Sequence, residues 1–209
     1  MSPDPLARLR TLPKAGHPNE DVSTVRGNCT DDVNQLNVNA LAYYAGAGTN
    51  VFGNEQARHI QLVEANVRRR RGGPPGAWAE AHALEAETIY DVPVHDEMLN
   101  RGGHTVSGAC VAHFIDICTC SALYALGCTL NQDIEGASQA LEVKYHAPAL
   151  LGMTLRIVAT TLTIRGRVLT ARAEVYDKAT GKLLFSGVHT MTTTKGGHQA
   201  AAQRAASRL

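Results

Sequence analysis

The chain has 209 residues, enough for one domain of ordinary size with a substantial core and an extension. Its 20 Lys and Arg side chains nearly balance 19 Asp and Glu side chains, so the formal net charge is +1. This balance excludes a whole-protein electrostatic field that would attract nucleic acid or an anionic membrane surface. Any basic binding site must therefore be local.

Residues 1–30 are polar, rich in Pro and Gly, and without a hydrophobic period. We expect them to form a loosely ordered extension. They lack the apolar segment of a secretion signal, and prolines interrupt the amphipathic helix that a mitochondrial presequence needs. The expected location is therefore cytoplasmic, with a mitochondrial location as the alternative.

Residues 31–78 are expected to form a helical extension. Thr30 is a good N-cap, two acids follow it in the first turn, and Val33 and Leu36 begin a helical stripe. A second helix is predicted over residues 54–71, closed by the sequence GGPPG. Its last four residues are arginines, which suit a helix C-terminus in solvent. A nuclear signal and a phosphate-binding patch are the alternatives for this run.

The remainder of the chain is mainly β in character, with one long apolar helix. Alternation with a period of two predicts five strands and one hairpin turn. The strands are residues 82–94, 139–145, 153–164, 167–176 and 182–193, the turn is residues 177–182, and the helix is residues 108–127. An apolar helix must be covered on most sides, so we predict an antiparallel meander curved around it. This helix also carries polar side chains, and we expect no membrane span.

Five cysteines occur in the chain, and four of them lie in or next to the apolar helix: Cys110, Cys118, Cys120 and Cys128. They have neither C-x-x-C spacing nor a matching pair of histidines. We interpret them as small buried side chains in a reducing compartment, and we expect no metal site.

One acid, Asp116, lies in the middle of the apolar helix. A buried carboxylate is costly unless it is paired or used, so Asp116 is either a satisfied acid, for example paired with His113, or a tuned acid or base. The N-terminus of the same helix offers backbone N–H donors, and Gly108 in its first turn would let a substrate approach the backbone closely. A carboxylate and such donors together are suited to a reaction in which a proton is removed and negative charge develops on a substrate oxygen.

The order strand, long helix, four strands resembles the hotdog fold, an α+β class. The residues resemble its acyl-CoA thioesterase branch of the phenylacetate-pathway and acyl-CoA thioesterase 13 type. The turn NRGGHTVSGA at residues 100–109 is similar to that branch's N-x-x-G-x-x-H-G-G motif. Asp116 lies nine residues after Ser107, and Ser138 precedes YHAPA at the family's spacing. The resemblance covers roughly residues 80–195.

The resemblance implies a catalytic set of Asp116, Gly108, Ser138, Ser107 and Asn100. Asp116 would act on water from the partner subunit of a dimer, Ser138 would hydrogen-bond that water, and the Gly108 N–H would hold the oxyanion. The family histidine is replaced by Ser107, which is also an excellent helix N-cap. His104 is a candidate replacement for that histidine, with a plain loop residue as the alternative.

Substrate-binding positions implied by the resemblance are Ala109 beside the oxyanion site and Arg165, Gly166, Arg167 and Lys195 for coenzyme A. Each of these basic residues has a solvated turn residue as its alternative. The chain has only three Phe and one Trp, and its many small aliphatic residues favour an aliphatic acyl group.

We therefore expect an acyl-CoA thioesterase that is a homodimer, with a dimer of dimers as the larger assembly. Coenzyme A would be part of the substrate, so no cofactor is expected. The expected domain is residues 79–196, followed by a tail at residues 197–209. One alternative is a non-catalytic acyl-CoA or lipid-binding hotdog protein. The other is a hotdog hydratase or dehydratase that uses His113 and Asp116.

Overall fold

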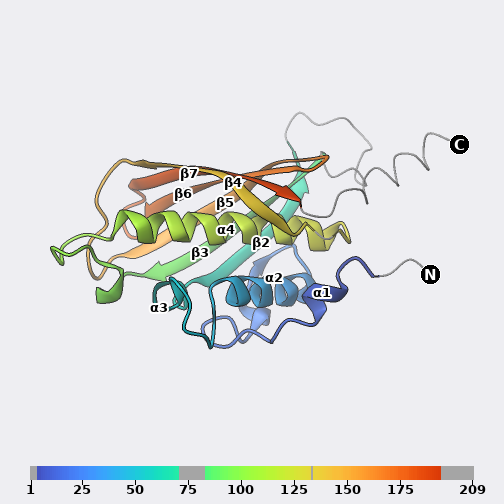
Figure 1. The fold of residues 1–209 in the computed structure, drawn as a ribbon, viewed down its shortest axis with the longest axis horizontal. Helices are drawn as coiled ribbons and strands as arrows, with labels where there is room; N and C mark the ends of the chain where they lie inside the picture. The colour runs from blue at the N-terminus through green and yellow to red at the C-terminus, as the bar shows by residue number, and fades with distance from the viewer. Residues whose placement is uncertain (1–3, 71–82, 133, 194–209) are drawn as a thin grey trace, which may run out of the picture.

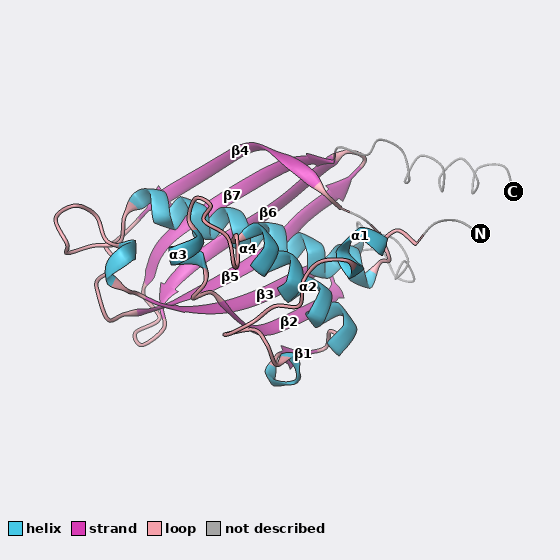
Figure 2. Ribbon diagram, turned by 60° about the horizontal axis from the view of Figure 1, so that its bottom comes forward, coloured by secondary structure: helices cyan, strands magenta, loops and turns pink. Residues whose placement is uncertain are grey.

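The computed structural model describes residues 4–70, 83–132 and 134–193. A seven-stranded curved sheet lies along one side of the long helix α4 (Gly108–Thr129), and helix α2 (Asp31–Tyr44) lies along the other side (Figure 1). The α+β class and the central helix are therefore as predicted. The sheet covers only one side of the apolar helix α4. Helix α2 forms a second layer that covers the other side (Figure 2).

The sheet has the strand order β1-β2-β3-β5-β6-β7-β4. Its strands are β1 (Arg26–Gly27), β2 (Gln61–Arg69), β3 (Leu84–Pro93), β4 (Gly136–Tyr145), β5 (Thr154–Arg165), β6 (Val168–Asp177) and β7 (Leu183–Thr193). All pairings are antiparallel except that of β1 with β2. The predicted meander is correct for β5, β6 and β7, but β4 pairs with β7 at the edge of the sheet instead of with β5.

The core lies between the sheet and α4. Alternate residues of the strands, such as Tyr90, Leu155 and Ile157, are fully buried and face the helix residues Phe114 and Ile115. Burial of each large apolar side chain contributes about 1.5–3 kcal/mol, so this layer accounts for much of the stability. The apolar residues of β3, β5, β6 and β7 thus recur with a period of two because one face of each strand is buried.

The second predicted helix, residues 54–71, is wrong. Only α3 (Asn54–Ala57) is helical there, and the chain then forms β2, which pairs with β3. The register of that pairing shifts between Leu62 and Glu64. Such a bulge breaks the alternation of the strand, so its apolar residues acquire a spacing that imitates a helical stripe.

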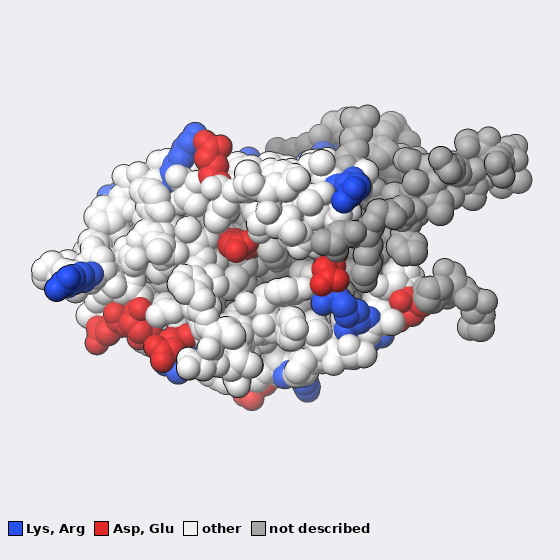
Figure 3. Space-filling model, viewed as in Figure 1, with Lys and Arg blue, Asp and Glu red and all other residues white. Residues whose placement is uncertain are grey.

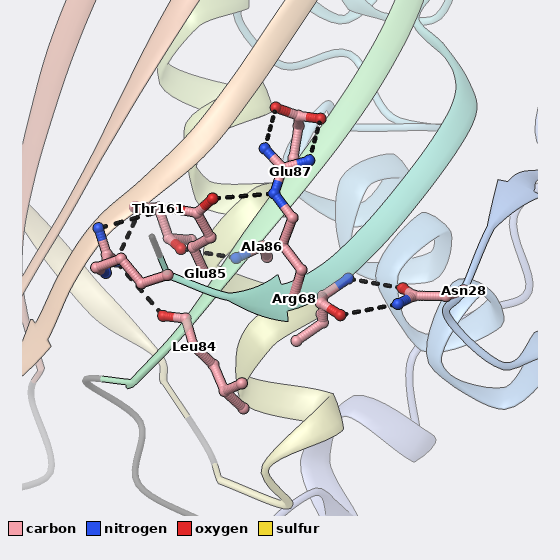
Figure 4. Close-up of polar contacts among 9 residues, drawn as sticks. Asn28, Arg68, Leu84, Glu85, Ala86, Glu87 and Thr161 are labelled. Atoms are coloured by element: carbon pink, nitrogen blue, oxygen red, sulfur yellow. Dashed lines mark hydrogen bonds and ion pairs between the residues drawn. The ribbon is translucent and has the colours of Figure 1, made fainter. Parts of the chain in front are cut away.

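The arginine run consequently lies on a strand. Arg68 contacts Glu85 and Glu87 on β3, with nitrogen–oxygen distances of 3.0–3.1 Å (Figure 4). On the far side of β2, Asn28 exchanges two hydrogen bonds with the backbone of Val67, at 2.8 and 2.9 Å. These contacts give the run a role in the sheet, and Arg71 lies outside the described residues.

The prediction of a loosely ordered extension over residues 1–30 is wrong, because the described part of this segment forms ordered elements. Helix α1 (Ala7–Arg10) and a 3₁₀ turn (Val22–Thr24) precede β1, and Leu6 and Leu9 are buried. The side chain of Asn19 accepts from the Leu62 N–H and donates to the Ile60 carbonyl. Because β2 is an integral strand of the sheet, residues 31–78 do not form a purely helical extension.

Helix α2 is as predicted. Thr30 occupies its N-cap, and the Thr30 hydroxyl accepts from the Val33 N–H at 3.4 Å. The helix packs on α4, where Ser121 donates a buried hydrogen bond of 2.7 Å to Asn37. A second 3₁₀ turn (Asp96–Met98) and the residues up to Ser107 then lead the chain into α4.

Candidate active site

The carboxylate of Asp116 is half-exposed, with 41% of its side-chain surface accessible. This corrects the expectation that an acid on this helix would be buried. Its oxygen Oδ1 lies 3.5 Å from Nδ1 of His189 on β7. Asp116 therefore lies next to a histidine of the sheet, and the open part of the carboxylate is available to a ligand or to water.

His189 is the site residue that the sequence analysis missed. Its side chain is fully buried under α4, and its Nδ1 lies 2.8 Å from the Thr119 hydroxyl oxygen. The Thr119 hydroxyl already donates to the carbonyls of Ile115 and Asp116, at 2.7 and 2.9 Å. A hydroxyl has one proton, and the two carbonyl oxygens can only accept it, so we assign Thr119 as the acceptor of the His189 hydrogen bond. This assignment places the imidazole proton on Nδ1 and leaves Nε2 as an acceptor.

Ser138 uses that acceptor. Its hydroxyl oxygen lies 2.9 Å from His189 Nε2. Ser138 is on β4, opposite Met191 of β7, and the register shifts between Ser138 and Ala140. The serine hydroxyl thus donates to the histidine, and its lone pairs remain available to a substrate or a water molecule.

Burial lowers the pKa of His189, and the nearby Asp116 only partly opposes this effect. The imidazole is therefore neutral near pH 7, which agrees with the tautomer set by Thr119. A neutral histidine between a serine and a carboxylate can hold the serine proton in one orientation.

The N-terminus of α4 forms a second group. Ser107 occupies the N-cap position but makes no side-chain cap hydrogen bond. Gly108 and Ala109 in the first turn are exposed. The Tyr145 hydroxyl donates to the Gly108 carbonyl oxygen at 2.9 Å. This tyrosine therefore does not occupy the Gly108 N–H. Donors at the start of a helix that no cap engages are suited to an anion.

Within one chain these two groups are separated. Eight residues of α4 between Gly108 and Asp116 span about 12 Å. Seven residues of β4 between Ser138 and Tyr145, the neighbour of Gly108, span about 23 Å. A thioester carbonyl cannot contact both groups of one chain at the same time.

The remaining predicted residues are dispersed. The Asn100 side chain is used within its own turn, where it donates to the Thr105 hydroxyl and accepts from the Gly102 N–H. Its predicted catalytic role therefore has no support in its contacts, and His104 is an exposed residue of the same turn.

The basic residues predicted to bind coenzyme A lie at the other end of the sheet from the start of α4. Arg165 ends β5, Gly166 adopts a left-handed conformation in the turn, and Arg167 is exposed and contacts the Thr193 carbonyl. This hairpin is thus at the Ser138 end of β4. Lys195 lies outside the described residues.

His113 contacts the loop before α3 instead of forming a hydrogen bond with Asp116. Its ring packs edge-on against Phe52 with centroids 5.4 Å apart, and its buried Nε2 has no hydrogen-bond partner among the described residues. Burial lowers the pKa of His113. The His113–Asp116 hydrogen bond, needed for the satisfied-acid interpretation and for a hydratase, is therefore absent, and the imidazole beside Asp116 is that of His189.

Comparison with known families adds one match. Residues 103–184 match the family model of the thioesterase superfamily. This span is somewhat less than half of the chain; it contains Ser107, Gly108, Asp116 and Ser138 and ends before His189. The match supports a thioesterase-type activity in general. No curated protein matches the chain.

Solved structures resemble this fold. Thioesterase superfamily member 2 of zebrafish superposes with a TM-score of 0.54 at 20% identity, over 75% of this chain and 96% of that one. The protein smu.793 of Streptococcus mutans UA159, solved bound to acetyl CoA, gives a TM-score of 0.50 at 15% identity, over 72% of this chain and 96% of that one. The fold is therefore that of the hotdog thioesterases.

All five cysteines are free. Cys110, Cys118 and Cys128 are buried, and burial raises the pKa of the Cys110 thiol to about 12. Cys120 is half-buried and lies beside Asp116, with Sγ 3.8 Å from Oδ1. Among the described residues, α4 alone is long and apolar enough to cross a bilayer, but most of it is buried between the sheet and α2.

Proposed function

We propose that the protein is an acyl-CoA thioesterase that hydrolyses an aliphatic acyl-CoA to coenzyme A and a carboxylate. The observation that carries the proposal is the half-exposed Asp116 beside His189, which hydrogen-bonds to Ser138, with Asp116 and Ser138 both inside the span that matches the thioesterase superfamily. The acetyl CoA bound to smu.793, a protein with the same fold, supports the coenzyme A part of the proposal.

In the proposed reaction, the Asp116 carboxylate takes a proton from water as the water oxygen attacks the thioester carbon. The Ser138 hydroxyl, whose proton points to His189, accepts the second proton of that water in a hydrogen bond. The tetrahedral oxyanion is held by the Gly108 N–H at the start of a helix. The intermediate then expels the thiolate of coenzyme A, which takes the proton held by Asp116, and the carboxylic acid product loses its remaining proton to solvent.

The separation of Gly108 from Asp116 supports a site shared between two subunits. Strand β4 pairs with β7 along one edge, its other edge pairs with no described strand, and Leu141 and Tyr145 on it are exposed. An unpaired, partly apolar edge strand favours self-association. Charged side chains are also sparse over most of the face on which α4 is seen (Figure 3).

The test is a panel of acyl-CoAs with chains from acetyl to palmitoyl and one aromatic acyl group, with released coenzyme A detected by a thiol reagent. We expect release from aliphatic substrates and a loss of at least about 100-fold in Asp116→Asn, since general-base catalysis contributes that much. The exposed Asp96→Asn is the matched control.

Two results would contradict the proposal. A thermal shift with acyl-CoA but no thiol release above the Asp116→Asn level would identify a non-catalytic acyl-CoA-binding protein. Hydration of an enoyl-CoA without thiol release would identify a hydratase, for which the structure offers no His113–Asp116 hydrogen bond.

A further inference from the structure

We propose that Asp116, Cys120 and His189 bind a zinc-class divalent cation, and that the bound cation inhibits thioester hydrolysis. The first half of this proposal stands on the geometry of the three side chains alone. The second half rests on the proposed function, because it requires Asp116 to act on water.

Three potential ligand atoms of different chemistry converge at this point. Asp116 Oδ1 lies 3.5 Å from His189 Nδ1 and 3.8 Å from Cys120 Sγ, and Cys120 Sγ lies 3.9 Å from His189 Nδ1. In a tetrahedral zinc site with bonds of about 2.0 Å to N and O and 2.3 Å to S, ligand atoms are separated by about 3.3–3.6 Å. Shifts of a few tenths of an ångström would therefore close the triangle around an ion.

The scaffold holds these atoms on rigid elements. Asp116 and Cys120 are four residues apart on α4 and so project from the same face of the helix. His189 is in the middle of β7, which is paired on both sides. The half-exposed carboxylate of Asp116 provides the route by which an ion and a fourth ligand, water, reach the site.

Charge balance also favours a divalent cation. The Asp116 carboxylate and a Cys120 thiolate supply two negative charges, and the imidazole binds as a neutral ligand. Binding releases the thiol proton to solvent. The imidazole proton moves from Nδ1 to Nε2, where it is donated to the Ser138 oxygen in place of the present Ser138 donation. Nitrogen, sulfur and oxygen ligands together are typical of zinc and cobalt.

Inhibition follows from the same rearrangement. The carboxylate oxygen that would take the proton from water is engaged by the ion. In addition, Ser138 loses its acceptor on His189 Nε2, so its hydroxyl no longer has the orientation set in the metal-free site. Cys120 contacts Asp116 but has no part in the proposed reaction, so it can be changed without changing the catalytic groups.

The binding experiment uses Co²⁺ as the probe, because a thiolate–Co²⁺ bond has a charge-transfer absorption in the near ultraviolet. We expect this absorption to saturate at one ion per chain in the wild type and in the control Cys128→Ser, a thiol two turns further along α4. We expect it to be absent in Cys120→Ser and Cys120→Ala, with affinity more than about tenfold weaker. Absence of the band in the wild type, or its persistence in both Cys120 variants, would overturn the site.

The activity experiment titrates Zn²⁺ into metal-free enzyme during thioester hydrolysis. We expect the wild type and Cys128→Ser to lose activity as one ion binds, and Cys120→Ser to keep both its activity and its resistance to Zn²⁺. Equal inhibition of the wild type and Cys120→Ser, or faster hydrolysis with Zn²⁺, would overturn the inhibitory role. Thioester hydrolysis absent from all variants, alongside the Co²⁺ band, would refute the proposed function and leave the site established.

Discussion

The Ser138 hydroxyl distinguishes two kinds of hydrolase, because it lies 2.9 Å from a neutral histidine that also neighbours a carboxylate. If Ser138 positions water, Ser138→Ala should lower kcat about tenfold, as expected for one lost hydrogen bond of about 1 kcal/mol or slightly more. The measurement is steady-state thiol release together with intact-protein mass spectrometry of enzyme quenched during turnover. The nearby exposed Gln139→Ala is the control.

A nucleophilic role for Ser138 predicts a different result. The loss in kcat would then equal that of Asp116→Asn or exceed it, and the quenched wild-type enzyme would carry an acyl group. Either finding would replace the water mechanism proposed above.

The buried His189 makes the stability of the protein depend on pH. Its pKa is lowered by burial, so between that value and the ordinary value near 6.5 the unfolded chain binds more protons than the folded chain. The free energy of unfolding should therefore fall as the pH decreases from about 6.5 through this window. Urea unfolding at a series of pH values should show a smaller dependence in His189→Gln.

Part of the dependence should remain in that variant, because burial also lowers the pKa of His113. The exposed His146→Gln is the control for the loss of one imidazole from the chain. An unchanged slope in His189→Gln would mean that this imidazole binds protons equally in the folded and the unfolded chain, so that burial does not lower its pKa.

The sequence predicted that Asp116 and Ser138 belong to one site but did not reveal that His189 lies between them. The signal for His189 was present, because the alternation of β7 places it on the same face as the buried Phe185 and Met191. The pattern shows that the face is buried but not which residue of α4 lies opposite. That contact depends on how α4 crosses the sheet.

The N-terminus of α4 can be tested as an element, because its first position tolerates proline. Gly108→Pro removes the backbone N–H and adds a ring at this position, and Ser107, with φ −60° and ψ 135°, already has the extended conformation that precedes proline. We expect a fall in kcat of about 100–1000-fold relative to Gly108→Ala, which keeps the N–H. The Ala variant is needed because a Cβ here approaches the Tyr145 ring at 3.3–3.4 Å.

Gly108→Pro and Gly108→Ala should have similar melting temperatures. Similar values would show that the lower kcat results from the lost N–H donor and not from a misplaced helix. Equal activity of the two variants would exclude the Gly108 N–H as the oxyanion donor. Because the Ser107 side chain makes no cap hydrogen bond, we also expect Ser107→Ala to leave the stability of the helix and the activity nearly unchanged.

An element could be predicted from the sequence when its signals lie within its own residues. Helix α2 carries its signals locally, in the Thr30 cap and the stripe after it, so it was predicted correctly. Strand β2 was mistaken for a helix because its bulge at Leu62 and Glu64 disrupts the period of two. A bulge depends on the partner strand, and the residues of β2 alone do not show it.

For the whole molecule, local signals were also insufficient to give the strand order. The alternation in β4 indicates a strand, but its place beside β7 depends on the path of the chain around α4. The N-terminal residues likewise looked disordered by composition, although Leu6, Leu9 and Asn19 bury themselves against α2, α4 and β2. The fold class was predictable because it rests on one long apolar helix followed by alternating strands.

A shared site makes a prediction that only the assembly can satisfy. Asp116→Asn and Gly108→Pro should each inactivate a homodimer, since each removes one half of both sites. In a heterodimer of the two variants, the intact Gly108 of one chain meets the intact Asp116 of the other. One of the two sites is then complete, so activity should recover to about half that of the wild-type dimer.

The two variants can be co-expressed with different affinity tags and the heterodimer isolated through both. Thiol release is then compared with that of each homodimer, and light scattering reports the mass of the assembly. Recovery far above both homodimers requires that the oxyanion donor and the base come from different chains. A heterodimer no more active than the homodimers, or a wild type that hydrolyses acyl-CoA as a monomer, would instead require α4 of one chain to supply both groups, which a separation of about 12 Å along the helix opposes.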